Sequence, residues 1–267
     1  MSEFPGAEAP IESAEYAVVG APLDVSTTFR PGTRFGPERV RRFARSVEGY
    51  DRRTDRRFSE LVSDAGDVSA WNDTPEYLGF LEGRLGDHRD AGRLPLLLGG
   101  EHTVTVAGVR AVSPDIYVCL DAHLDLYESY AGDEFSHATV TRHALETADE
   151  AVLLGVRTGS EAEWNRATEA DVTVVPPEAV SEWSPAFDGR EAYLSVDIDA
   201  ADPGFAPGTG TPTPFGLRPR ELRRVVRSVA PSAVGFDVVE VNDRDDGQAA
   251  ALAGGLLREF VFAHADR

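Results

Sequence analysis

The sequence contains no lysine, so all 26 of its basic residues are arginine. They are outnumbered by 46 aspartate and glutamate residues, which gives the chain a formal net charge of −20 at pH 7. A surface this acidic repels phosphate groups and argues against nucleic acid as a partner. The acidic residues are spread along the chain instead of forming one tail. Because salt screens their mutual repulsion, the composition favours the hypothesis of a protein adapted to high salt.

Cysteine and long apolar segments are also scarce. The only cysteine, Cys119, has no partner for an internal disulfide and lies in a run of strand type, which predicts a structural and not a catalytic thiol. The N-terminus has no basic segment followed by an apolar one, and no apolar run is long enough to span a membrane. We therefore expect no membrane association and a cytoplasmic location.

A chain of 267 residues is long enough for one large α/β domain with a substantial core. No linker, low-complexity tract or internal repeat divides it, so residues 1–267 are predicted to form a single domain. Residues 1–11 are mostly small or acidic and include two prolines. We expect them to form a mobile arm before the first strand.

Apolar segments of strand type alternate with segments of helical periodicity along the rest of the chain. Strands are predicted at residues 16–20, 61–67, 95–100, 116–120, 151–156, 172–175, 191–196 and 233–241. Helices are predicted at residues 37–47, 75–90, 103–112, 137–147, 161–170, 218–229 and 247–263. Such alternation is typical of a parallel sheet with helices on both faces. The predicted fold is a three-layer α/β/α domain with a mainly parallel sheet of about eight strands.

Three of the predicted strands are followed by carboxylates and imidazoles. These residues are His102 after the strand at 95–100, Asp121, His123 and Asp125 after the strand at 116–120, and Asp197 and Asp199 after the strand at 191–196. In an extended chain, residues two apart point to the same side, so the members of each group converge. The carboxyl ends of parallel strands meet at one edge of a sheet, where ligands bind.

Four carboxylates and two imidazoles in one place repel one another or lack partners unless a cation lies between them. The six groups are more than one ion needs, and they fit two. Their oxygen-rich balance favours Mn²⁺ over Zn²⁺ or iron–sulfur chemistry. For any one of these segments alone, the alternative is a polar loop after a strand.

The same segments resemble the metal-binding signatures of the ureohydrolase (arginase/agmatinase) family. The three signatures are Gly99-Gly100-Glu101-His102, Asp121-Ala122-His123-Leu124-Asp125 and Ser195-Val196-Asp197-Ile198-Asp199-Ala200-Ala201-Asp202-Pro203. Residues 30–37 (Arg-Pro-Gly-Thr-Arg-Phe-Gly-Pro) resemble the N-terminal motif of the agmatinase branch, and residues 208–212 and 239–242 resemble the C-terminal motifs. The match extends over nearly the whole chain, with departures from the usual pattern at Thr213, Phe215 and Asp243.

The resemblance implies an arginase-like fold and two Mn²⁺ ions per chain. A hydroxide that bridges the ions would attack the central carbon of a guanidino group, and urea and an amine would be released. By the same resemblance, Asp121 and Asp197 bridge the ions. The remaining ligands complete one ion each, His102 with Asp125 and His123 with Asp199.

The resemblance also assigns roles to three residues outside the signatures. His137 resembles a family histidine that acts in proton transfer, which suits an imidazole near neutral pH. Its alternative role is that of an ordinary residue at the start of a helix. Glu240 resembles the glutamate that pairs with the guanidinium, and its alternative is a solvated carboxylate at the sheet edge. Thr211 is placed among the substrate-binding residues.

Other polar residues are predicted to have no catalytic role. His88, His143 and His264 lie in predicted helices outside the motifs and are expected at the surface. Asp64 and Asp67 invite comparison with di-metal phosphoesterases, but the Gly-Asn-His element of those enzymes is absent. We therefore expect both aspartates to be structural.

Within the family, the sequence favours agmatine as the substrate, hydrolysed to putrescine and urea. Arginases typically have an asparagine two residues after Asp-x-His-x-Asp, where this chain has Leu126-Tyr127. The loop that follows has no basic residue before Arg142 and contains three acidic ones, Glu128, Asp133 and Glu134. We expect this loop to repel the α-carboxylate of arginine.

Alternatives remain open from the sequence alone. Arginase, guanidinobutyrase and formimidoylglutamase share the metal signatures, and a non-catalytic metal-binding paralogue would belong to a different class. The resemblance further implies a small cationic guanidino substrate and a homo-oligomer, either a trimer or a hexamer.

Overall fold

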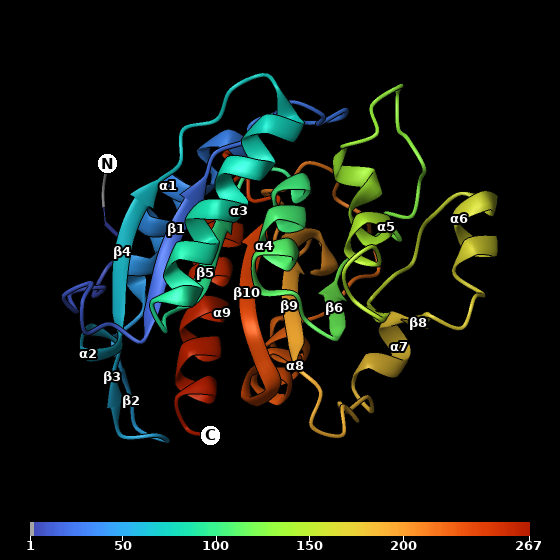
Figure 1. Cartoon of the computed structure of the whole chain (residues 1–267). Helices are drawn as coiled ribbons and strands as arrows, with labels where there is room; N and C mark the ends of the chain where they lie inside the picture. The colour runs from blue at the N-terminus through green and yellow to red at the C-terminus, as the bar shows by residue number, and fades with distance from the viewer. Residues whose placement is uncertain (1–2) are drawn as a thin grey trace.

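The computed structural model describes residues 3–267, and an eight-stranded sheet forms its centre (Figure 1). All neighbouring strands of this sheet are parallel. In spatial order they are β4 (Val62–Asp67), β1 (Tyr16–Ala21), β5 (Leu94–Gly99), β10 (Ala233–Val239), β9 (Ala192–Asp197), β6 (Ile116–Leu120), β7 (Glu150–Leu154) and β8 (Val172–Val175). The predicted parallel sheet and its strands are confirmed.

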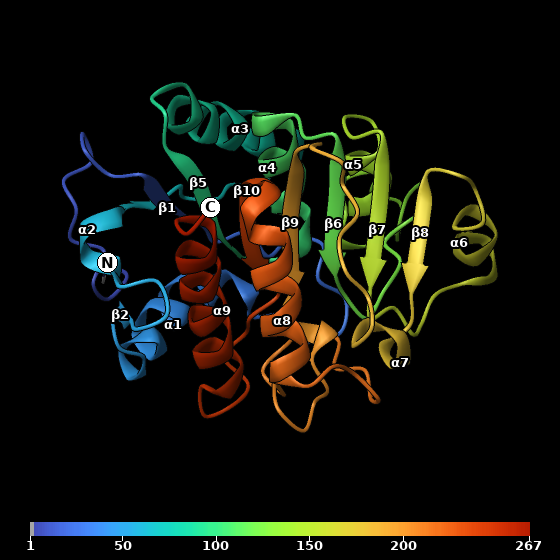
Figure 2. The same cartoon turned by 90° about the horizontal axis from the view of Figure 1, so that it is seen from below.

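Helices cover both faces of the sheet and make three layers (Figure 2). One apolar core lies between the sheet and α1 (Gly36–Phe43), α8 (Pro219–Val229) and α9 (Gln248–His264). A second core lies under α3 (Thr74–Asp90), α4 (Thr105–Val112) and α5 (Val140–Ala144). Because both faces are covered, β6 and β9 are buried at every position, which explains their nearly continuous apolar sequences.

The smaller elements lie around this frame. They are the antiparallel pair β2 (Tyr50–Asp51) and β3 (Arg56–Arg57), and the short helices α2 (Phe58–Leu61), α6 (Glu161–Arg166) and α7 (Pro177–Val180). Within residues 3–267, no helix is both long enough and apolar enough to cross a membrane.

Local sequence signals explain where two of the long helices begin. The side chain of Asp73 accepts a hydrogen bond from the Glu76 backbone N–H, and Pro75 occupies the first turn of α3. Helix α9 begins after Gly247, whose φ of 98° favours glycine. A Cβ atom at this position would also collide with the ring of Phe43 on α1.

The N-terminal segment is packed on the sheet edge, so the prediction of a mobile arm is corrected for residues 3–11; residues 1 and 2 lie outside the described part. Phe4 is 1% exposed and packs against Phe58. The backbone N–H of Phe4 donates to the Asp64 carboxylate (2.6 Å), and that of Ala9 donates to the Val62 carbonyl on β4 (3.1 Å). Hydrogen bonds to the edge strand β4 thus fix residues 3–11, although their composition is typical of a mobile segment.

Asp64 and Asp67 pair with the buried guanidinium of Arg41 and thereby join β4 to α1. Arg41 Nε lies 2.7 Å from Asp64, and both side chains are about 1% exposed. These contacts agree with the structural roles expected from the sequence.

The expectation that His88, His143 and His264 lie at the surface is wrong, because all three are buried. Each has a polar partner, as buried polar groups generally do. The Tyr16 hydroxyl lies 2.7 Å from His264 Nδ1, and His143 Nε2 lies 2.9 Å from the backbone carbonyl oxygen of Glu134. His88 Nδ1 accepts a hydrogen bond from a neighbouring arginine.

Candidate metal centre

The six predicted ligands lie together at the carboxyl edge of the sheet. They follow strands at its centre: β5 leads to His102, β6 leads to Asp121, His123 and Asp125, and β9 ends in Asp197 with Asp199 in the next turn. Strand β10, between β5 and β9, leads to Glu240. The parallel topology therefore brings residues that are far apart in the sequence to one place.

Asp121 contacts both imidazoles of the cluster. Its Oδ2 atom lies 3.2 Å from His102 Nδ1, and its Oδ1 atom lies 3.5 Å from His123 Nδ1. The other carboxylates each face one imidazole: His102 Nδ1 is 2.8 Å from Asp125 and 3.5 Å from Asp197, and His123 Nδ1 is 3.1 Å from Asp199. Atoms about 3 Å apart have the spacing of neighbouring ligands in an octahedron with metal–oxygen bonds of about 2.1 Å.

The buried carboxylates create an excess of negative charge. Burial and the charge of Asp121 raise the pKa of Asp125 to about 7. Burial and the charges of Asp199 and Asp121 raise the pKa of Asp197 well above its usual value. Burial opposes the charged form of His123, but the charge of Asp199 and the hydrogen bonds that the ring donates to Asp121 and Asp199 raise its pKa to about 12. The cluster attracts positive charge, so its donor set fits divalent cations.

A serine and an aspartate that sequence reasoning missed lie behind His102. His102 Nε2 is 3.2 Å from Ser195 Oγ, which donates a 2.6 Å hydrogen bond to Asp237. Asp237 is fully buried and also accepts from the Tyr193 hydroxyl. Such partners fix the ring of a metal-binding histidine. The available signal was a carboxylate, Asp237, in the middle of the apolar strand predicted at residues 233–241.

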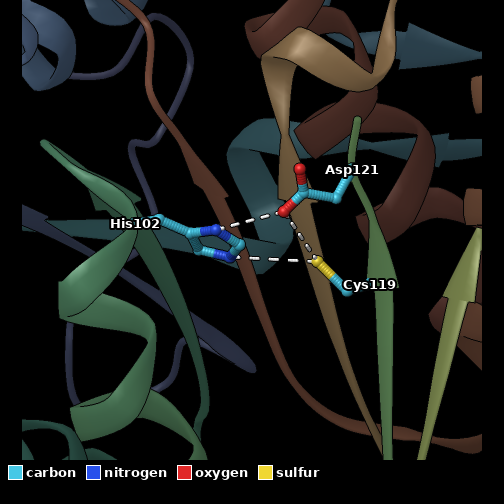
Figure 3. Close-up of side chains that lie close together, drawn as sticks. All are labelled: His102, Cys119 and Asp121. Atoms are coloured by element: carbon cyan, nitrogen blue, oxygen red, sulfur yellow. Dashed lines mark hydrogen bonds and ion pairs between the residues drawn. The ribbon is translucent and has the colours of Figure 1, made fainter. Parts of the chain in front are cut away.

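Figure 3 shows Cys119 and Asp121 side by side next to the His102 ring, with Asp121 facing Nδ1 and Cys119 facing Nε2. Its sulfur is 3.8 Å from His102 Nε2 and 3.7 Å from Asp121 Oδ2. Burial raises the pKa of this thiol to about 12. Because the thiolate is the form that binds metal and attacks substrates, this environment agrees with a structural cysteine.

Glu240 turns into the site in an unusual backbone conformation. Its φ is 61°, a left-handed value that is uncommon for residues other than glycine. Its Oε1 atom accepts a 2.8 Å hydrogen bond from the backbone N–H of His102, and burial raises the pKa of this carboxyl well above its usual value. Glu240 is 6% exposed, so the alternative of a solvated carboxylate at the sheet edge does not describe it.

The cluster opens into a cavity of about 700 Å³. Its walls combine predicted site residues with aromatic and small polar side chains: Thr28, Phe29, His102, His123, Leu124, Asp125, Tyr127, Tyr130, His137, Ala138, Thr158, Gly159, Ser160, Glu163, Asp197, Asp199, Thr211 and Glu240. His137, Thr211 and Glu240 therefore share one cavity with five of the six predicted ligands. Thr213, Phe215 and Asp243, which depart from the family pattern, are not among the lining residues in the described chain.

His137 lies in this cavity wall and also begins a short 3₁₀ helix (His137–Thr139) that leads into α5. His137 therefore lines the candidate site and also begins a helix, so the two roles considered from the sequence do not exclude each other. Burial, with the charges of His102 and His123, lowers its pKa to about 4. Near neutral pH the ring is thus uncharged and has a lone pair that can accept a proton.

Arg157 stabilises the loops beside the site and was not singled out by any sequence pattern. It donates to the backbone carbonyls of Asp199 (2.7 Å) and Thr213 (2.8 Å), which lie in different loops. Its guanidinium is therefore used in holding the backbone after β9. A lone arginine in a glycine-containing loop has no distinctive sequence signature.

The fold and the cluster define an α/β protein with a candidate site for two divalent ions, a class that includes the binuclear metallohydrolases. Comparison with known proteins gives the family. The model of the arginase family matches residues 14–263. The chain belongs to the arginase family and is a ureohydrolase. The alternative of a di-metal phosphoesterase is therefore wrong.

Its relatives cover almost its full length. It is 34% identical to an agmatinase of Bacillus anthracis, over 94% of this chain and 92% of that protein. It is also 34% identical to an N(1)-aminopropylagmatine ureohydrolase of Thermococcus kodakarensis, over 96% of this chain and 91% of that protein. The crystal structure of agmatine ureohydrolase of Thermoplasma volcanium aligns with a TM-score of 0.91 at 30% identity, over 100% of this chain and 95% of that one.

Proposed function

We propose that the protein hydrolyses agmatine to putrescine and urea and that it uses two Mn²⁺ ions per chain. The observation that carries this proposal is the charge of the cavity. Its walls contain several carboxylates but, in the described chain, no arginine, and the sequence has no lysine. A substrate with a carboxylate at its far end meets no side chain of opposite charge other than the histidines, whereas the amine of agmatine meets carboxylates.

The loop after β6 contributes to this selectivity in another way than expected. Its acidic residues, Glu128, Asp133 and Glu134, do not line the cavity. Glu128 is exposed and lies 3.5 Å from Arg142. The prediction that these three carboxylates face the substrate is therefore wrong. The loop instead supplies two aromatic residues of the cavity wall, Tyr127 and Tyr130, whose rings can contact a cationic tail. Apart from the metal cluster and Glu240, the wall contains one further carboxylate, that of Glu163.

The proposed ligands are the six residues of the cluster, with Asp121 and Asp197 shared by both ions. His102 with Asp125, and His123 with Asp199, would complete one ion each. Two ions bound here would supply a hydroxide nucleophile near neutral pH and polarise the guanidino group. The observation that supports a bridging role for Asp121 is that its two oxygens face different imidazoles.

Glu240 is proposed to orient the guanidinium. Its Oε1 atom accepts from the His102 backbone N–H, which leaves Oε2 free to accept from an N–H group of the substrate guanidinium. An added Cβ at Gly210 would lie 2.9 Å from Oε2, so the motif glycine leaves the room that this carboxylate needs. The next residue, Thr211, lines the cavity and is proposed to contact the substrate.

His137 is proposed to deliver a proton to the leaving amine. Cleavage of the guanidino C–N bond releases the amine only when its nitrogen is protonated. A neutral imidazole in the cavity wall can take a proton during attack and return it to the amine nitrogen. Its place in the wall of the cavity that it shares with the cluster and its lowered pKa support this role.

The test is a comparison of urea release from four guanidino compounds by protein loaded with Mn²⁺. We expect kcat/KM for agmatine to exceed that for arginine and for guanidinobutyrate by at least about 100-fold, roughly 2.7 kcal/mol of transition-state preference. N(1)-aminopropylagmatine, which has a longer cationic tail, should also be accepted by an acidic cavity. Equal rates with arginine would contradict the proposal, and no urea from any compound would favour the non-catalytic alternative.

A further inference from the structure

Glu101 is a buried carboxylate to which the metal signature assigns no role. It is 0% exposed, and its oxygens accept four short hydrogen bonds. Oε2 accepts from the backbone N–H groups of Val25 and Ser26 (2.7 Å each), and Oε1 accepts from the hydroxyls of Ser26 and Thr103 (2.9 Å each). Surrounded by donors, this carboxylate acts as an acceptor only.

The hydroxyl of Ser26 connects this carboxylate to His137. Ser26 Oγ lies 3.0 Å from His137 Nδ1, and it also accepts a 2.9 Å hydrogen bond from the His137 backbone N–H. A serine hydroxyl has one proton and two lone pairs. Because the proton is donated to Glu101, both lone pairs accept, so the imidazole must donate its Nδ1–H to Ser26.

One other group competes for the same ring nitrogen. The Ser136 hydroxyl lies 3.3 Å from His137 Nδ1, and as a donor it would place the imidazole proton on Nε2 instead. That contact is longer than the one with Ser26, which favours Ser26 as the partner of Nδ1. The capping role of Ser136 does not decide the question, because its oxygen accepts the Ala138 backbone N–H and its proton remains available. The edge contact between Tyr130 and the imidazole, with ring centroids 5.6 Å apart, also helps to fix the ring.

We propose that Glu101 and Ser26 are positioning residues that hold His137 in the tautomer with its proton on Nδ1 and its lone pair on Nε2. Nε2 has no hydrogen-bond partner among residues 3–267, and the residue lines the cavity. The consequence for catalysis rests on the proposed function. Nε2 accepts the proton released in the attack step and gives the same proton to the leaving amine, while the Nδ1 proton stays on the ring and is donated to Ser26 Oγ.

The tautomer can be measured directly by ¹⁵N NMR of histidine-labelled protein, with Mg²⁺ as a diamagnetic ion in the site. The chain has only six histidines, and His137→Asn assigns the signal. We expect a protonated Nδ1 and an unprotonated Nε2 in the wild type. A protonated Nε2 in the wild type overturns the proposal.

Two variants test the direction of the hydrogen bonds. In Glu101→Gln the side-chain amide donates to Ser26, whose hydroxyl must then donate to His137 Nδ1, so the ring proton should move to Nε2. In Ser26→Ala, Nδ1 loses its acceptor and the same shift should occur. Thr27→Ala is the matched control, because Thr27 also approaches Glu101 (3.5 Å) but has no contact with His137. An unchanged tautomer in a folded Ser26→Ala overturns the proposal.

Kinetics supply the second readout. Ser26→Ala should lower kcat for agmatine by about 10-fold or more with KM changed by less than about 3-fold. Ser26→Thr, which keeps the hydroxyl, should restore most of kcat, and Thr27→Ala should leave it unchanged. Equal kcat in wild type and Ser26→Ala contradicts the proposal. If no guanidino compound yields urea, the proposed function fails, but the NMR result still decides the tautomer.

Discussion

At the scale of single residues, Asp121 has the central position in the candidate metal centre. Each of its carboxylate oxygens faces a different imidazole, and it follows directly from the end of β6. A group shared in this way cannot be replaced by its neighbours, because Asp125 and Asp199 each face only one of the two imidazoles. We therefore expect the loss of Asp121 to affect both ions.

His137→Asn should lower turnover without emptying the metal site. The substitution removes the group that accepts and returns a proton, so we expect kcat to fall by roughly 10²–10⁴-fold. Metal content should stay unchanged, because no ligand is altered. Urea release and elemental analysis of the same sample check both expectations.

The matched control is His143→Asn, which replaces a buried histidine of α5 that does not line the cavity. Its kcat should remain within a few-fold of the wild type. Wild-type turnover in a fully metallated His137→Asn would return His137 to the role of an ordinary residue at the start of a helix.

The predicted ligands could be found from the sequence because each depends only on its own strand and the few residues that follow it. Alternation along a strand places Asp121, His123 and Asp125 on one side without knowledge of the rest of the fold. The supporting contacts could not be found in this way. Ser26 and Glu101 are 75 residues apart, and Ser195 and Asp237 are 42 residues apart in neighbouring strands. Such pairs follow from strand order, which local periodicity does not specify.

At the scale of the elements, strand order decides what the site contains. β10 is the last strand in the sequence, yet it lies between β5 and β9 at the centre of the sheet. This position brings Glu240 to the His102 backbone and completes the wall of the cavity. The sequence predicts Glu240 near the end of a strand at residues 233–241, but the insertion of that strand between two ligand-bearing ones is a property of the folded sheet.

Helix α9 shows a signal that the prediction of surface histidines overlooked. Its residues are apolar on nearly every side, and such a helix is usually buried all round. His264 at its last turn is therefore 4% exposed and lies 2.7 Å from the Tyr16 hydroxyl of β1. The hydrogen bond between the hydroxyl and the imidazole joins the end of the helix to the sheet.

This contact predicts a loss of stability in acid. Burial, and to a smaller extent Arg267, lowers the pKa of His264 from 6.5 to about 4 in the folded protein. His264 binds a proton more readily in the unfolded chain than in the folded protein. The contribution of its neutral form to the free energy of unfolding is therefore complete above pH 6.5 and is lost as the pH falls toward 4. We expect a loss of about 2 kcal/mol in unfolding free energy between pH 7 and pH 5 from this group.

Thermal melting of wild type and His264→Gln at both pH values, in the same concentrated salt, measures this contribution. The variant should be less stable at pH 7 and should lose less stability on acidification. An identical decrease in melting temperature in both proteins would show that His264 is not the group responsible.

At the scale of the whole molecule, the dominant feature is the charge of −20. Repulsion within a compact, acidic chain opposes folding, and salt at molar concentration reduces the Debye length to about 3 Å. We expect the melting temperature to rise between dilute buffer and concentrated KCl. A melting temperature that is constant or falls over this range would refute adaptation to high salt.

A cytoplasmic location and a trimeric or hexameric assembly also stay predictions.

The central claim is that six residues from three strand ends hold two Mn²⁺ ions that the reaction requires. Elemental analysis of protein reconstituted with Mn²⁺, together with urea release from agmatine, tests it most directly. We predict two Mn²⁺ per chain in the wild type, and in folded Asp121→Ala a loss of much of the metal together with the activity. One tightly bound Zn²⁺ per chain, with urea release indifferent to Mn²⁺, would contradict the account.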